Sequence, residues 1–115
     1  MKFVIFPNHS KDSDYTVTKN TAQYVSSCGA SVYMHISLKD ELCELAGTVT
    51  FADENELYCD ADFAVVIGGD GSILRAAKAL YGKDIPIIGV NLGKVGYMAE
   101  LERDDLSPII GISLP

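Results

Sequence analysis

One acidic side chain stands in a glycine-rich turn, beside residue types that commonly contact phosphates. Asp70 lies within Gly68-Gly69-Asp70-Gly71-Ser72, and Arg75 follows about one helical turn later. Glycines let a ligand approach the backbone closely, and free N–H groups at the start of a helix attract anions. A carboxylate beside a phosphate is unfavourable unless a metal, a cation or a transferable proton balances it. The combination indicates phosphoryl transfer, in which such a carboxylate holds Mg²⁺ or deprotonates an attacking hydroxyl.

Each of these residues also has a simpler structural interpretation. The turn is compatible with a tight connection that binds nothing, Asp70 with a helix N-cap, and Arg75 with a solvated surface position. The turn is not a Walker A loop, because no Gly-Lys-Ser/Thr follows, and it is not a G-x-G-x-x-G dinucleotide fingerprint. From the residues alone, a phosphate site and a purely structural turn both stay open.

The turn is expected between a strand and a helix. Phe63–Ile67 is a short apolar run typical of a buried strand, and the apolar residues after the turn recur at helical spacing, which predicts a helix over Gly71–Tyr81. A further strand is expected over Ile87–Val90, and a second glycine-bearing loop, Asn91–Met98, follows it. Parallel strands carry ligands at their carboxyl ends, so the two loops should converge on one phosphate-binding cleft.

The N-terminal half predicts the same alternation of strand and helix. Strands alternating with helices give an α/β fold, a mostly parallel sheet with helices on both faces. We expect strands over Lys2–Phe6 and Ser31–His35, and between them a helix that Asp12 or Ser13 caps and that ends near Cys28. Weaker patterns predict a short helix through Leu38, Leu42 and Leu45, a strand or link over Thr48–Phe51, a solvated acidic stretch over Asp53–Asp62, and a helix that begins at Pro108.

Composition restricts the class of protein. The 115 residues are 48% hydrophobic and 22% charged, as in an ordinary soluble domain, and no apolar run is long enough to span a membrane. The net charge of −7 argues against a nucleic-acid-binding surface. Cys28, Cys43 and Cys59 have no C-x-x-C spacing, and His9 and His35 have no metal-ligand spacing. We expect reduced thiols in or near the core, and a cytoplasmic protein.

Two segments together resemble a family of kinases. The Gly-Gly-Asp-Gly sequence after an apolar strand is similar to the motif of a superfamily that includes NAD kinases, diacylglycerol and sphingosine kinases, and 6-phosphofructokinases. The second loop, Ile88–Glu100, resembles the NAD kinase pattern Gly-hydrophobic-Asn-x-Gly-x-Leu-Gly-Phe-hydrophobic, with Val95 and Tyr97 in place of leucine and phenylalanine. The similarity extends from the first strand to about Glu102 and favours NAD kinase among these families.

The resemblance implies a fold, a reaction and a set of site residues. The chain would be the N-terminal, Rossmann-like α/β nucleotide-binding domain, residues 1–115, with a C-terminal β-rich NAD-binding domain absent from it. ATP, with its Mg²⁺, would phosphorylate the 2′-hydroxyl of the adenosine ribose of NAD, giving NADP. Asp70 would be the catalytic carboxylate. The nucleotide and phosphate contacts would come from Gly68, Gly69, Gly71, Ser72, Arg75, Asn91, Gly96 and Tyr97.

The same resemblance sets expectations for partners and leaves two alternatives open. The partners would be small-molecule nucleotides, the full-length protein a homo-oligomer, and these residues inactive by themselves. A lipid or sugar kinase of the same superfamily is the first alternative, which the second loop disfavours. A non-catalytic nucleotide-binding module is the other, since a glycine turn with half of its cleft missing would bind without transferring phosphate.

Overall fold

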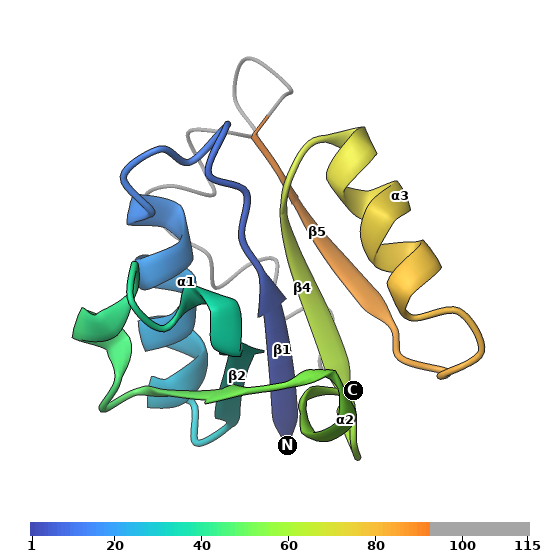
Figure 1. Cartoon of the computed structure of the whole chain (residues 1–115), viewed down its shortest axis with the longest axis horizontal. Coiled ribbons are helices and arrows are strands. Elements are labelled where there is room, and N and C mark those ends of the chain that lie inside the picture. Colours follow the sequence, from blue (N-terminus) through green and yellow to red (C-terminus); the bar gives the residue numbers. More distant parts are fainter. Residues whose placement is uncertain (93–115) are drawn as a thin grey trace.

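Five parallel strands form a single sheet in the computed structural model. The structure describes residues 1–92, except for the side chain of Asn91. The order of the strands across the sheet is β3-β2-β1-β4-β5, and Figure 1 shows β1, β4 and β5 side by side. This arrangement confirms the predicted α/β fold with a parallel sheet. The strands are β1 (Lys2–Phe6), β2 (Ser31–His35), β3 (Val49–Ala52), β4 (Phe63–Gly68) and β5 (Ile87–Asn91).

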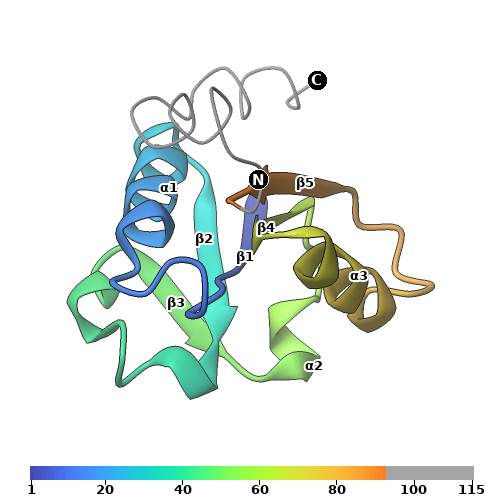
Figure 2. The same cartoon turned by 90° about the horizontal axis from the view of Figure 1, so that it is seen from above.

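Helices cover both faces of the sheet, as predicted. Helix α1 (Thr16–Ser27) connects β1 to β2, and α3 (Asp70–Ala79) connects β4 to β5 (Figure 2). The two connections lead outward from the centre of the sheet in opposite directions, and right-handed crossovers then place their helices on opposite faces. A short helix, α2 (Glu54–Leu57), lies in the connection from β3 to β4.

The central strands are buried on both sides. Every residue of β4 is buried, which explains its continuous apolar run. On the α1 side, Ile5 and Val65 are paired in register and pack with Val25 of the helix. On the other side, a Cβ added at Gly89 would lie 3.0 Å from Cδ1 of Ile73, so α3 packs very close to β5. The start of α3 is therefore fixed against two strands.

Helix α1 begins later than predicted. Its N-cap is Tyr15, which has a left-handed backbone with φ of 58° and no side-chain cap bond, so neither Asp12 nor Ser13 is the N-cap. Asp12, three residues before the N-cap, nevertheless provides hydrogen-bond acceptors for the first turn of the helix. Its buried carboxylate accepts hydrogen bonds from the backbone N–H of Val17 and of Thr18 and from the Thr18 hydroxyl.

The helix predicted through Leu38, Leu42 and Leu45 is wrong. This segment contains two separate 3-10 turns, η1 (Ile36–Leu38) and η2 (Cys43–Leu45). Leu42 and Leu45 are nonetheless buried. Their spacing arose because the connection between β2 and β3 packs these leucines into the core, although it does not form one continuous helix.

Other predictions for the N-terminal half had mixed outcomes. The acidic residues of Asp53–Asp62 are exposed, as expected of a solvated stretch. The three cysteines are free but exposed, so the prediction that they lie in or near the core is wrong. Among residues 1–92, no helix combines the length and apolar character needed to cross a bilayer. The helix predicted from Pro108 lies outside the described residues.

Candidate functional site

The glycine turn lies at the centre of the carboxyl edge of the sheet. Strands β1 and β4 are neighbours, and the chain winds outward from them on either side, so the loops that follow them flank a topological switch point. Open α/β sheets bind ligands at this position. Gly68 is also paired with Asn91, and the N–H of Leu92 donates to the Gly68 carbonyl at 2.7 Å. The predicted adjacency of the strands before the two loops is confirmed, while Gly96 and Tyr97 lie outside the described residues.

Gly68 is required by the fold itself. Its φ is +148°, in the region that L side chains rarely adopt. An added Cβ would also lie 2.8 Å from Nδ2 of Asn8 and 2.9 Å from Cβ of Ser72. Backbone strain and lack of space thus both exclude a side chain here.

The other two glycines have no such backbone requirement. Gly69 has an extended conformation, φ −115° and ψ −165°, and the atom that an added Cβ would meet is Cε of Lys11, at 3.1 Å. Gly71 is within α3, and among the described residues an added Cβ would meet Nη1 of Arg75 alone, at 3.7 Å, an ordinary contact. Glycine in a helix costs about 0.5–1 kcal/mol relative to alanine. A ligand that approaches the backbone at Gly71 would account for that cost.

Asp70 is the first residue of α3, not its N-cap. Gly69 is the N-cap residue, and it has no side chain that could bond to the helix. The interpretation of Asp70 as the N-cap is therefore wrong. Asp70 is exposed at the mouth of the turn. A negative charge in the first helical turn is also favourable to the helix dipole.

The hydroxyl of Ser72 connects the turn to the loop after β1. Its Oγ accepts a hydrogen bond from Nδ2 of Asn8 at 2.6 Å and a longer one from Nη2 of Arg75 at 3.4 Å. Arg75, an exposed residue, thus contacts the Ser72 hydroxyl from about one helical turn later. A hydroxyl has two acceptor lone pairs and one hydrogen. With both lone pairs engaged, the Ser72 hydrogen is the group left to donate to an anion.

These side chains line a cleft of about 260 Å³. It lies between the ends of β1 and β4 and the first turns of α3, so its wall carries a basic residue, a hydroxyl and an amide within an otherwise apolar surface. The lining residues are Phe6, Pro7, Asn8, Val66, Ser72, Arg75 and Ala76.

Two residues of this site were not identified from the sequence, Asn8 and Lys11. Both belong to the polar segment Pro7–Asp12, which follows the first strand, and open α/β sheets bind ligands at the carboxyl ends of their strands, so this position was the available signal. Which of the loop residues face the turn depends on contacts between residues more than fifty positions apart, such as Asn8 with Ser72, and local spacing does not encode these.

The residues present fit a magnesium ion that is shared with a nucleotide. Within residues 1–92 there is no group of three or more His, Cys, Asp or Glu side chains that could hold a metal ion. Mg²⁺ in phosphoryl-transfer sites is commonly bound by one or two carboxylates together with phosphate oxygens and water. Asp70 supplies one carboxylate at the turn, which suits that mode.

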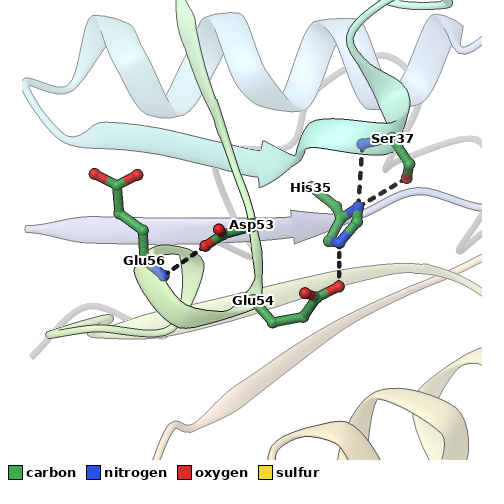
Figure 3. A network of polar contacts seen from close by, with 5 residues as sticks. All are labelled: His35, Ser37, Asp53, Glu54 and Glu56. Carbon is green, nitrogen blue, oxygen red and sulfur yellow. Dashed lines mark hydrogen bonds and ion pairs between the residues drawn. The ribbon is translucent and has the colours of Figure 1, made fainter.

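A second polar network lies at the ends of β2 and β3. Nδ1 of His35 accepts from the Ser37 N–H at 3.1 Å, which leaves Nε2 to donate to Glu54 (Figure 3). This bond to His35 holds the pKa of the Glu54 carboxyl below its usual value. Asp53 caps α2 by accepting from the Glu56 N–H at 3.2 Å. The Ser37 hydroxyl also lies 2.8 Å from Nδ1 of His35, and the network ties β2 to α2.

Comparisons with known proteins agree along most of the chain. Residues 3–111 match the family model of the ATP-NAD kinase N-terminal domain. The chain is 42% identical over 101 residues to the NAD kinase of Lachnoclostridium phytofermentans, covering 88% of this chain and 33% of that protein. It is 31% identical over 106 residues to the NAD kinase of Acetivibrio thermocellus, covering 92% of this chain and 36% of the relative.

The chain thus spans about a third of the length of the curated relatives it matches. The matched region includes residues of all five strands and the Gly-Gly-Asp-Gly turn at the carboxyl edge of the sheet. Sequence, fold and the position of the turn agree, and the chain belongs to the ATP-NAD kinase family, as its N-terminal domain.

Proposed function

We propose that these residues are the N-terminal nucleotide-binding domain of an NAD kinase, which transfers the γ-phosphoryl group of ATP to the 2′-hydroxyl of the adenosine ribose of NAD. The observation that carries the proposal is the Gly-Gly-Asp-Gly turn at the switch point of the sheet, in a chain that matches NAD kinases from its first strand onward. A β-rich domain that follows in the full-length protein would complete the NAD pocket.

Asp70 would accept the proton of the ribose 2′-hydroxyl as that oxygen bonds to the γ-phosphorus. The bond from the γ-phosphorus to the bridging oxygen then breaks, and ADP leaves with the electron pair. The exposure of Asp70 at the mouth of the turn supports this role, because the carboxylate is accessible to a substrate hydroxyl. Mg²⁺ bound to the phosphates would neutralise charge during transfer.

The rest of the turn would hold the phosphates. Backbone N–H groups of Gly69 and Gly71 are at the start of α3, where an anion is favoured. Ser72 would donate its hydroxyl hydrogen, and Arg75 would supply a positive charge from one helical turn away. These contacts act by position and charge, which is how most of the catalysis of phosphoryl transfer arises.

The second loop would form the neighbouring wall. Asn91 would anchor it, an assignment supported by the pairing of its backbone with Gly68. Gly96 would allow the loop to turn, and Tyr97 would pack against the dinucleotide. We further propose a cytoplasmic homo-oligomer for the full-length protein.

A substrate panel tests the proposal. The full-length protein is supplied with Mg²⁺ and either ATP or inorganic polyphosphate, and with NAD, NADH, diacylglycerol, sphingosine or fructose 6-phosphate as acceptor. We expect NADP or NADPH as the phosphorylated product. Phosphorylation of only a lipid or a sugar would identify another member of the superfamily. Nucleotide binding without any transfer would identify a binding module.

A further inference from the structure

We propose that Lys11, in the loop after β1, is a second cation of the donor-phosphate site and binds the phosphate chain from a different element of the fold than Arg75 does. The identity of the donor rests on the proposed function. The contact itself, between a lysine ammonium and a polyphosphate, would be the same for ATP and for inorganic polyphosphate.

The lysine side chain extends over the glycine turn. From the position that a Cβ on Gly69 would occupy, Cε of Lys11 is 3.1 Å away, Cδ is 3.8 Å and Nζ is 3.9 Å. Nη1 of Arg75 lies 3.7 Å from the equivalent position on Gly71. Each cation thus lies beside one of the two glycines that flank Asp70 in the sequence, Lys11 from the loop after β1 and Arg75 from α3.

The backbone of Lys11 is held in place on both sides. Its own N–H donates to the carbonyl and to Oδ1 of Asn8, at 3.3 and 3.2 Å, and Asn8 is bonded to Ser72 of α3. On the other side, the Asp12 carboxylate is 4% exposed and accepts from the N–H groups at the start of α1. Lys11 is therefore an exposed side chain on a loop anchored to both helices.

The charge of Lys11 is not used within the described fold. Its ammonium makes no hydrogen bond or ion pair with residues 1–92, whereas Lys19 pairs with Glu44 and Lys2 donates to two backbone carbonyls. A polyphosphate that enters the turn meets the Asp70 carboxylate in a protein of net charge −7. Like charges at such distances are costly unless cations balance them, and lysine binds phosphate as a compact point charge.

Titration calorimetry on the full-length protein tests this directly, with Mg-ATP and inorganic tripolyphosphate as separate probes. Lys11→Met keeps the length of the side chain and removes the charge. We expect both ligands to bind roughly 10- to 100-fold more weakly, the range of one charge-assisted hydrogen bond. Lys11→Arg should recover most of the affinity. Lys83→Met, the same charge change in the turn before β5, at the opposite edge of the sheet, is the matched control and should bind as wild type does.

The melting temperatures of all variants should agree, which excludes a purely structural effect. An effect of Lys11→Met on ATP but not on tripolyphosphate would place the contact at the nucleoside and overturn the proposal, as would wild-type affinity for both. A failure of the wild-type protein to bind either probe would also overturn it. Absence of NADP formation despite a Lys11-dependent affinity would instead count against the proposed function alone.

Discussion

At the scale of single residues, the three glycines of the turn respond to different constraints. Gly68 is needed for its backbone conformation, and Gly69 leaves room for Lys11, whereas the described fold has space for a methyl group at Gly71. Substitution of Gly68 and of Gly71 therefore separates a role in folding from a role in ligand binding.

Gly71→Ala should leave the domain as stable as wild type or stabilise it by about 0.5–1 kcal/mol, because alanine favours the helix. It should nevertheless lower NAD kinase activity, because the methyl group would occupy the space next to the phosphate. Urea unfolding and steady-state kinetics on the full-length protein measure the two effects. Unchanged activity would show that no ligand approaches at Gly71.

Gly68→Ala should behave in the opposite way. The positive φ and the close approach of Asn8 and Ser72 predict that the free energy of unfolding falls by about 1–3 kcal/mol. Urea unfolding under the same conditions compares the stability of Gly68→Ala with that of Gly71→Ala. Equal stability of the two variants would contradict our explanation of the turn.

At the same scale, the sequence was informative where the relevant contact is local. Ser72 and Arg75 are three residues apart on one helix, so their contact is local, and the sequence located both residues beside the turn. The bond from Asn8 to Ser72 joins residues 64 positions apart. It exists because β1 and β4 are neighbours in the sheet, and no local pattern reports that order.

At the scale of elements, the start of α1 depends on two buried residues outside the helix. Asp12 bonds to the helix N–H groups, and Tyr15 turns the chain into the helix with a left-handed backbone. The sequence located this helix and its end near Cys28 because helical patterns are a local property of the chain. It placed the N-cap too early because the Asp12 carboxylate reaches residues five and six positions ahead instead of its immediate neighbours.

Replacing Asp12 should destabilise the domain strongly. Asp12→Ala removes the acceptor for two buried N–H groups and one buried hydroxyl, which should cost about 2–4 kcal/mol. The exposed neighbour Asp14 is the control, and Asp14→Ala should cost clearly less. Urea unfolding of the two variants measures the difference, and equal losses would mean that Asp12 does not hold the start of α1.

Tyr15 should make the fold sensitive to alkaline pH. Burial, and then its hydrogen bond to Glu41, raise the pKa of its hydroxyl from 10.0 to about 12. The folded state therefore keeps a proton that the unfolded state loses, so this contribution to stability is full below pH 10 and is lost as the pH rises toward about 12.

Unfolding free energies measured across that interval should fall less steeply for Tyr15→Phe than for wild type. Some slope will remain, because burial also raises the pKa of Tyr58. The same slope in both proteins would contradict the assignment to Tyr15.

At the scale of the whole molecule, the doubly wound sheet brings the loop after β1 and the glycine turn after β4 to one edge, where they line a cleft. The fold class followed from the alternation of elements, which is recorded along the chain. The pairing of β1 with β4, which defines the switch point, required the structure. The chain spans about a third of the length of its relatives, and the proposed NAD pocket needs a second domain.

The 115 residues by themselves should consequently show little or no NAD kinase activity, even when folded. An assay of NADP formation with the purified chain, with circular dichroism to confirm folding, checks this expectation. Robust turnover, free of contaminating enzyme, would mean that the cleft is complete without a further domain.

The most direct test of the account is the turnover number of Asp70→Asn in the full-length protein. The amide keeps the size of the side chain and cannot accept the ribose proton. We predict that kcat for NADP formation falls by at least ~10²-fold, the scale of a lost general base, while the melting temperature stays at the wild-type value. Near-normal kcat in a correctly folded Asp70→Asn protein would contradict the central claim that this carboxylate performs the chemistry.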